Sequence, residues 1–263
     1  MVNLGSPDST SVKDVKKYLD EFLMDKRVIG KSYLFRFLLV KGIILNFRPK
    51  KSAAAYKKIW WKEGSPLIVL SRRLFDKVKQ LIAIPAALAM RYGSISIYNG
   101  IHELDKQGVN EIIVLPLYPH YAMSSYESVV VKVEEEILKN FSHIKTKVIP
   151  AFYNDPLYLK AMINNIKSHL KDIDYDYLLF SYHGLPESHL RISDPTNFHC
   201  QSNSCCEKGS VAHNTCYKHQ VFETTKAIAQ ALNLKEGSYS NAFQSRLANE
   251  PWLKPYTDSE LKR

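Results

Sequence analysis

The chain has 263 residues, of which 45% are apolar, so it can bury a sizeable core in one large domain or two smaller ones. Lysine and arginine exceed aspartate and glutamate by 36 − 26 = 10, but they are spread along the chain without any RNA- or DNA-binding motif, which disfavours a nucleic-acid partner. No run reaches the ~18 uninterrupted apolar residues of a membrane span. Met1 also leads directly into an apolar strand pattern, without the basic region and cleavage site of a secretory leader. We therefore expect a cytoplasmic protein.

Strand and helix patterns alternate through the first 150 residues. Apolar residues at helical spacing predict helices, and short apolar runs bounded by turn residues predict strands. The predicted strands are Val2–Leu4, Ala87–Tyr92 and Glu111–Leu115, and the predicted helices are Val12–Met24, Tyr33–Leu45, Pro66–Leu81 and Tyr126–Leu138. Val148–Pro150 begins a crossing into the second half.

The second half repeats this alternation. We expect helices at Leu157–Leu170 and Val221–Leu232, strands at Tyr177–Tyr182 and Tyr239–Gln244, and a further helix from Thr257. Strands that alternate with helices imply parallel sheets and right-handed crossovers, and hence an α/β fold with two similar halves, residues 1–150 and 151–263. The chain has no GxGxxG motif, so this architecture does not imply a dinucleotide cofactor.

A histidine ends the apolar strand of the second half. The run Tyr175–Tyr182 predicts a fully covered parallel strand, and Gly184 and Pro186 break the chain directly after it. This would place His183 at the carboxyl end of a strand, where open α/β sheets bind their ligands. An imidazole titrates near neutral pH and can accept a proton or bind a metal there. Taken alone, a strand-capping role is an equally good interpretation.

All four cysteines lie in one short stretch, residues 199–217. They are Cys200, Cys205, Cys206 and Cys216. Disulfides are disfavoured in a cytoplasmic protein, whereas four thiolates can hold a tetrahedral zinc ion or a [2Fe–2S] cluster. The spacing lacks the paired CxxC of zinc ribbons, and free thiols without a ligand stay an open alternative. The nearby histidines, His199, His213 and His219, are expected to be surface residues.

Seven segments resemble ferrochelatases, the enzymes that insert ferrous iron into a porphyrin to make haem. The segment Phe180–Pro186 resembles their FSxHGLP signature, and Tyr18–Ile29 resembles YLxxFLxDxRVI. The other five occur in the family's order: Val2–Pro7, Gly64–Leu67, Met90–Gly93, Leu115–Tyr121, and Phe243–Arg246 with Pro251–Leu253 and Pro255–Asp258. Together they cover nearly the whole chain.

The resemblance implies two Rossmann-like, chelatase-type domains that face each other across a cleft. Residues 1–150 would form the first, and residues 151–263 the second, with a cysteine-rich insertion at 199–217. His183 would be the base and the contact for the Fe²⁺ substrate. The substrate-binding residues implied by the family fall into three groups: Arg48, Tyr56 and Ser65 for porphyrin propionates, Arg91, Tyr118 and Tyr121 for the wall or rim, and Leu4 and Trp252 for the apolar pocket.

Two further expectations follow from the resemblance. Some bacterial members carry an internal set of four cysteines, so Cys200, Cys205, Cys206 and Cys216 are expected to hold a [2Fe–2S] cluster. The apolar segment 33–47 corresponds to the lip of the porphyrin cleft. Flanking basic residues predict a peripheral contact with a membrane surface, although an ordinary core helix is an equal alternative. They are Lys31, Arg48, Lys50 and Lys51.

The chain also departs from the family pattern. The family's glutamate opposite the histidine lies on a strand that would follow Arg263, so we expect a second domain truncated at its C-terminus. Ala248–Glu250 replaces a common glycine-proline turn, and the first strand is short. Two alternatives therefore stay open: an inactive fragment that binds porphyrin or haem, and a chelatase that loads cobalt or nickel into another tetrapyrrole. The choice between protoporphyrin and coproporphyrin, and the oligomeric state, also stay open.

Overall fold

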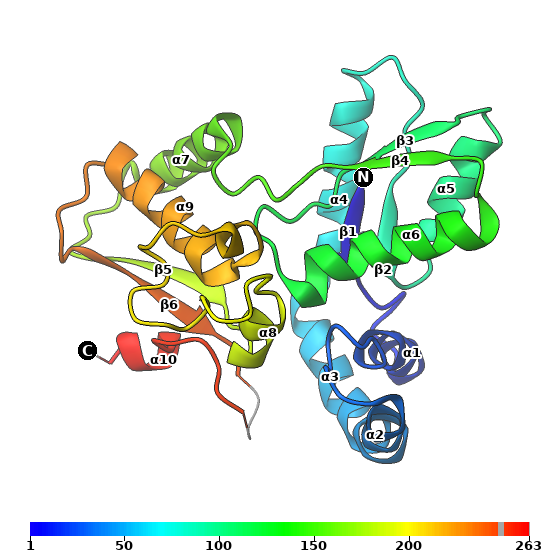
Figure 1. Cartoon of the computed structure of the whole chain (residues 1–263), viewed down its shortest axis with the longest axis horizontal. Coiled ribbons are helices and arrows are strands. Elements are labelled where there is room, and N and C mark those ends of the chain that lie inside the picture. The colour runs from blue at the N-terminus through cyan, green and yellow to red at the C-terminus, as the bar shows by residue number, and fades with distance from the viewer. Residues whose placement is uncertain (247–249, 263) are drawn as a thin grey trace. The chain divides into compact units, whose positions relative to one another are not determined.

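The computed structural model describes residues 1–246 and 250–262, and the chain folds into two compact units (Figure 1). Unit 1 consists of Met1–Tyr118 and Met123–Pro150, and unit 2 of Pro119–Ala122 and Ala151–Arg263. Both contain short parallel sheets flanked by helices, which confirms the predicted α/β fold class. The turn predicted around Ala248 and Asn249 lies outside the described residues.

Two pairs of parallel strands form the centre of unit 1. Strand β1 (Val2–Gly5) pairs with β2 (Ala89–Tyr92), and β3 (Glu111–Val114) pairs with β4 (Lys145–Val148). The amide of Val2 donates to the carbonyl of Leu115 over 2.9 Å, which links β1 to the end of β3. Helices α5 (Ile97–Asp105) and α6 (Ser128–Asn140) pack their apolar residues into the same core, which the sequence pattern indicated only for α6.

A second core of unit 1 lies between its N-terminal helices. Helix α1 (Val12–Leu23), a π-helical turn (Leu38–Ile44) and α3 (Leu45–Ile59) contribute Val15, Val40, Leu45 and Ala53 to it. The predicted helix Tyr33–Leu45 is in fact the short α2 (Tyr33–Phe37) followed by that π-helical turn. The sequence did not indicate α3 because its buried residues, Leu45, Pro49 and Ala53, form only a narrow stripe. Helix α4 (Pro66–Lys79) completes this part of the unit.

Unit 2 is built on one parallel strand pair. Strand β5 (Leu178–His183) pairs with β6 (Tyr239–Gln244) in register from Leu178 opposite Tyr239 to His183 opposite Gln244. Its helices are α7 (Pro156–Leu170), α8 (Glu187–Ile192), α9 (Tyr217–Ala231) and α10 (Thr257–Glu260) (Figure 1). The expectation that β5 is fully covered was wrong, because its six residues are all half-buried or exposed. Within the described part of the chain, only β6 pairs with it.

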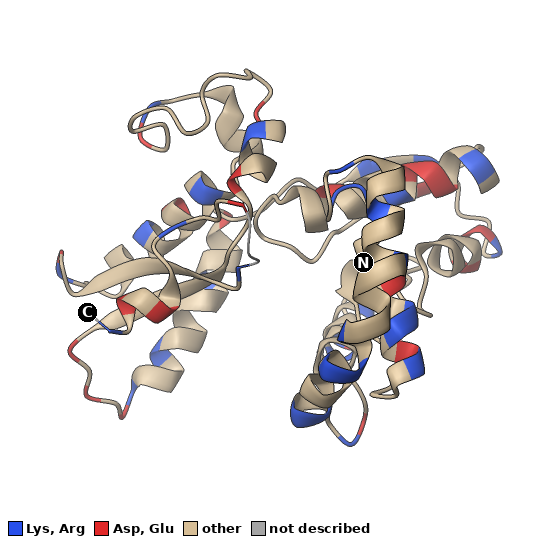
Figure 2. Ribbon diagram, turned by 90° about the horizontal axis from the view of Figure 1, so that it is seen from below, with Lys and Arg blue, Asp and Glu red and all other residues tan. Residues whose placement is uncertain are grey.

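Charged residues are distributed unevenly over the helices (Figure 2). Lys and Arg are mixed with Asp and Glu on α1, α4, α6, α8 and α9, whereas α2, α3 and α7 carry no acidic residue and α5 and α10 no Lys or Arg.

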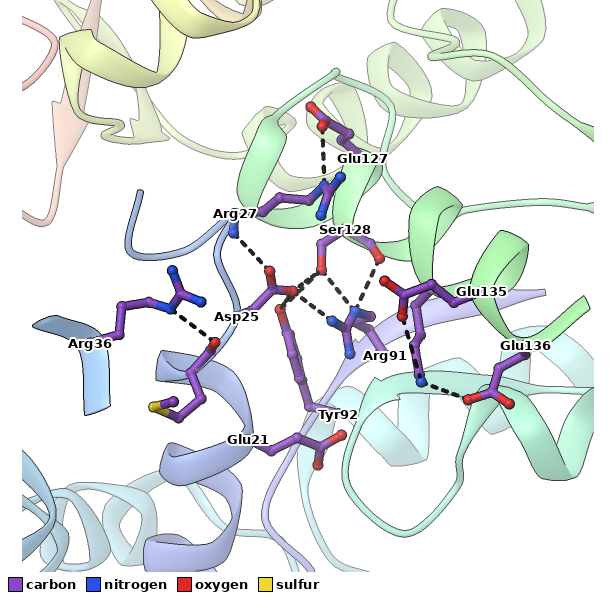
Figure 3. A network of polar contacts seen from close by, with 12 residues as sticks. Glu21, Asp25, Arg27, Arg36, Arg91, Tyr92, Glu127, Ser128, Glu135 and Glu136 are labelled. Atoms are coloured by element: carbon purple, nitrogen blue, oxygen red, sulfur yellow. Dashed lines mark hydrogen bonds and ion pairs between the residues drawn. The ribbon is translucent and has the colours of Figure 1, made fainter. Parts of the chain in front are cut away.

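A buried carboxylate joins three segments of unit 1 (Figure 3). The side chain of Asp25 is 5% exposed, and its Oδ2 accepts hydrogen bonds from Arg91 Nη2 at 2.6 Å and from Tyr92 OH at 2.8 Å. The Ser128 hydroxyl donates to the same oxygen, and the Arg27 amide donates to Oδ1 at 2.7 Å. Arg91 Nε also donates to the carbonyl of Ser128 over 3.0 Å. The network therefore ties the segment after α1 to β2 and to the start of α6.

The surroundings of Asp25 set its pKa. Burial opposes ionisation, but the Ser128 hydroxyl, the Arg27 amide and the Arg91 guanidinium together outweigh it and hold the pKa of Asp25 below its usual value. Because the folded pKa is lowered, this group stabilises the fold above its ordinary pKa. The stabilisation is lost as pH falls through the folded pKa.

Replacement of this carboxylate tests the network. We expect Asp25→Asn to lower the free energy of unfolding at pH 7 by about 3 kcal/mol, since Arg91 loses its buried partner. The variant should also lose less stability than the wild type between pH 5 and pH 3. Urea unfolding across this range measures both effects. Glu111→Gln, in an exposed ion pair with Lys147, serves as control and should change little. Equal acid sensitivity of wild type and Asp25→Asn would contradict the assignment.

The end of β1 contains a close backbone approach at Gly5. Its φ is +101°, and a Cβ at this position would lie 1.9 Å from the carbonyl oxygen of Tyr92. Only a residue without a side chain fits there.

A matched pair of glycine substitutions separates this clash from simple backbone strain. Gly108 also has a positive φ, of +77°, but a Cβ there would meet nothing within 4 Å. We expect Gly5→Ala to lower the free energy of unfolding by more than ~3 kcal/mol, and Gly108→Ala by about 1 kcal/mol. Urea unfolding midpoints of the two variants provide the comparison, and similar values would refute the importance of the Gly5–Tyr92 approach.

Candidate functional site

The backbone of His183 is held at the end of β5 by neighbours from two other elements. It pairs with Gln244 of β6, and the following amide, of Gly184, donates to the Gln244 carbonyl over 2.6 Å. The hydroxyl of Tyr217, the first residue of α9, donates to the His183 carbonyl over 3.0 Å. The side chain of His183 is exposed. The structure thus places an accessible imidazole on a fixed backbone at the carboxyl end of a parallel strand.

The turn after His183 leaves no room for a side chain at Gly184. A Cβ on Gly184 would lie 2.8 Å from the Ser245 carbonyl oxygen and 3.4 Å from the ring of Trp252. The segment 251–253 pairs with this turn, since Leu253 donates to the Leu185 carbonyl over 3.0 Å. Trp252 is only 8% exposed, and it therefore packs behind the turn that carries His183.

The state of the His183 ring follows from its surroundings. Although the ring is exposed, neighbouring atoms displace part of its water, and this desolvation lowers the pKa of His183 below its usual value. A lowered pKa makes the imidazole neutral at pH 7, and a neutral imidazole can accept a proton or bind a metal ion.

His120 and Tyr217 lie near this strand end, and neither of them was singled out from the sequence. The Nε2 of His120 lies 2.9 Å from Thr224 Oγ1 of α9, and burial lowers the pKa of His120 to about 4. Its ring meets Tyr182 and Tyr217 edge-on at centroid distances of 5.8 and 5.9 Å. The amide of Tyr121 donates to Gln220 Oε1 over 2.7 Å. His120 could have been selected, because it lies within the Leu115–Tyr121 segment that resembles the family. For Tyr217, the only indication in the sequence was its position directly after Cys216.

The predicted substrate residues of unit 1 lie in different surroundings. Leu4 and Tyr56 pack against the core of the N-terminal helices, and burial raises the pKa of Tyr56. Ser65 is 6% exposed and precedes the first residue of α4, without a hydrogen bond from its side chain to that helix. Arg48 is exposed on α3.

Arg91 and Tyr118 lie inside unit 1. Arg91 is engaged by Asp25 and Ser128, so the structure gives it contacts that hold the protein together. The Tyr118 hydroxyl is buried without a hydrogen-bond partner among residues 1–246 and 250–262, and burial raises its pKa. The predicted contact of both residues with a substrate stays a prediction. Tyr121, His183 and Trp252 belong to unit 2, and the other residues predicted to bind the porphyrin belong to unit 1.

The apolar segment 33–47 is largely exposed, contrary to an ordinary core helix. Its outward side chains are Tyr33, Leu34, Phe35, Phe37, Leu38, Ile43 and Phe47. A peripheral membrane contact of this segment stays a prediction. No helix in the described part of the chain is both long and apolar enough to cross a membrane.

The four cysteines gather in unit 2, where all of them line one cavity of about 100 Å³. The neighbouring thiols of Cys200 and Cys206 lower the pKa of the Cys216 thiol, although its burial acts in the opposite direction. All four are free cysteines. The structure therefore brings together the set that the sequence singled out.

The three neighbouring histidines hold the cysteine loop in place. The Nε2 atoms of His199 and His213 lie 2.8 and 2.9 Å from the Cys205 carbonyl oxygen, and His219 Nδ1 lies 2.9 Å from that of Cys206. Because a carbonyl only accepts, each ring nitrogen donates. The expectation that these histidines are surface residues was wrong, since all three are half-buried and two stack at a centroid distance of 3.6 Å.

Single-ion coordination has specific geometric demands. A tetrahedral zinc ion needs four ligands around one point. Among the residues that the structure describes, no three or more His, Cys, Asp or Glu side chains are arranged to hold a metal ion.

Comparison with known proteins gives the family. The family model of ferrochelatases matches residues 1–263. The chain is 47% identical over 267 residues to the ferrochelatase of Opitutus terrae, an alignment that covers 100% of this chain and 77% of that protein. It is 44% identical over 264 residues to the ferrochelatase of Pseudomonas fluorescens Pf0-1, with 99% and 77% covered. For the ferrochelatase of Azotobacter vinelandii the identity is 42% over 264 residues, with 99% and 78% covered. The chain therefore belongs to the ferrochelatase family.

Proposed function

We propose that this chain inserts ferrous iron into a porphyrin, with His183 as the base and the contact for the incoming metal ion. The observation that carries the proposal is the neutral, accessible imidazole on a fixed backbone at the end of β5. Membership of the ferrochelatase family supports the same reaction.

The chemistry of insertion explains why a neutral imidazole is wanted. A free-base porphyrin carries two pyrrole N–H protons, and both must leave as the metal ion enters. A base with a pKa near or below the working pH is ready to accept one of them, and an exposed ring can pass that proton to water before it accepts the second. The lowered pKa of His183 keeps the ring in the accepting form at pH 7. Tyr217 holds the backbone of His183 and is a positioning residue.

The flat macrocycle needs apolar walls and a few polar anchors. In this proposal Leu4 and Trp252 contribute apolar surface, and Arg48, Tyr56 and Ser65 hold propionates. An exposed guanidinium such as that of Arg48 can donate two parallel hydrogen bonds to a carboxylate. Tyr121 and Tyr118 would line the wall. Protoporphyrin and coproporphyrin both carry propionates, so both belong in the assay.

Removal of the imidazole tests the assignment. We expect His183→Ala to reduce anaerobic insertion of Fe²⁺ by roughly 10²–10⁴-fold, as for loss of a general base, while porphyrin binding persists. The wild-type rate should fall as pH decreases through the lowered pKa of His183. His143→Ala, which removes an exposed imidazole paired with Asp105, is the control and should leave the rate unchanged.

Each outcome of this assay has a distinct meaning. Binding that survives His183→Ala, combined with no insertion by the wild-type chain, would support the alternative of a porphyrin-binding fragment. Insertion at the wild-type rate by His183→Ala would remove His183 from the reaction.

We also propose that the cysteine set holds a [2Fe–2S] cluster. Four thiols around one cavity of about 100 Å³ supply the number and kind of ligands that such a cluster takes. Each iron needs two thiolates, so the cluster does not require three or four ligands around one point. When bound, it would supply a redox-active iron centre, and insertion of Fe²⁺ needs no electron from it.

The cluster proposal has a readout independent of catalysis. We expect chain purified without oxygen to contain about two iron and two sulfide ions, with visible absorption that disappears in Cys216→Ser. His183→Ala should keep the full iron and sulfide content, which serves as the control. Wild-type protein with intact free thiols and no sulfide would overturn the proposal.

A further inference from the structure

A cavity of about 160 Å³ opens in unit 1 where β1 and β2 end. Ser6 follows β1 and lines it from one side, and Ser65 and Arg72 line it from α4. Open α/β sheets bind ligands at the carboxyl ends of their strands. The volume is ample for a carboxylate group and a few water molecules.

Ser6 presents an unused polar group to this cavity. The residue is 7% exposed, and its hydroxyl is buried without a hydrogen-bond partner among the residues described. Such a buried hydroxyl costs free energy unless something bonds to it. Its position in the cavity lining leaves the hydroxyl open to whatever occupies the cavity, a water molecule or a ligand.

The start of α4 adds a second donor set to the cavity lining. Ser65 precedes this 14-residue helix, and its side chain forms no bond to the first turn. The hydroxyl therefore stays available, and the first turn carries the partial positive charge of a helix N-terminus. Both features favour an anion.

Among the described residues, the charged side chains that line the cavity include one cation, Arg72, for which no ion pair is recorded. Asp8 and Glu63 also line it. However, Lys17 lies 3.9 Å from Asp8 and Arg73 lies 3.3 Å from Glu63, so both carboxylates have a cation of their own. Arg72 is thus left to balance an incoming charge, and a single negative charge fits better than a multiply charged group.

We propose that this cavity is a carboxylate pocket in which Ser6 and Arg72 act together with Ser65 to hold one propionate of the porphyrin. The inference rests on the proposed function for its ligand, and it adds two specificity-determining residues to it. Ser6 donates its hydroxyl, Arg72 supplies the compensating charge, and the start of α4 orients the carboxylate.

Paired ligands test this pocket in the 263-residue chain. Protoporphyrin carries free propionates, whereas its dimethyl ester has the same ring without negative charge, and binding of both is followed by fluorescence. We expect Ser6→Ala and Arg72→Gln each to weaken binding of the acid roughly ten-fold, as for loss of a hydrogen bond to a charged group. Ester binding should be unchanged. Arg72→Lys should recover part of the affinity.

The neighbouring arginine provides a matched control. Arg73 lies beside Arg72 on α4 but pairs with Glu63, so Arg73→Gln should bind acid and ester like the wild type. Unchanged acid binding by both Ser6→Ala and Arg72→Gln would overturn the pocket while leaving the proposed function intact. An equal loss for acid and ester would also overturn it, since it would indicate an apolar or structural role. Wild-type chain that binds neither ligand would overturn the proposed function, and this inference with it.

Discussion

Both units depend on a glycine backbone that comes closer to a neighbouring carbonyl than any Cβ allows. In unit 1 this is Gly5 against Tyr92, and in unit 2 it is Gly184 against Ser245. Each glycine stands directly beside a candidate site residue, Ser6 in one unit and His183 in the other. Close packing of two chain segments at the end of a strand thus gives each of these residues a fixed backbone, so that its position does not depend on a mobile loop.

The two units then stabilise their strand ends in different ways. Unit 1 uses a buried carboxylate, and Asp25 draws donors from β2, from α6 and from its own segment. Unit 2 uses short backbone bonds and a tryptophan behind the turn. Charge is costly to bury unless it is fully paired, and the Asp25 network meets that condition with four donors. This explains why Arg91, a reasonable rim residue by resemblance, is engaged inside the unit.

Much of this fold could be predicted from the sequence, since apolar periodicity and turn residues locate most strands and helices to within a few residues. Helix α3 was not predicted because only three of its residues are buried. The π-helical turn was not predicted because the spacing of its apolar residues resembles that of an ordinary helix. The partial exposure of β5 was not predicted, because an apolar run does not show how many strands pair with it. At the candidate site, His183 and the cysteines were singled out by residue type, and their roles stay predictions. The proposed role of Ser6 could not be predicted, because a serine after a strand is common. Only the structure shows that its hydroxyl lacks a hydrogen-bond partner among the described residues.

The cysteine segment between α8 and α9 is held mainly by its own side chains. Ring nitrogens of His199 and His213 bond the Cys205 carbonyl, and Asp194 accepts from the Cys200 amide at 2.7 Å. These bonds close within the segment, but the segment also packs against the strand pair, because Cys216 lies in the same apolar core as Leu185 and Phe243. Tyr217, directly after Cys216, donates to the His183 carbonyl, so a change in the cysteine segment has a path of only two residues to the backbone of the strand end.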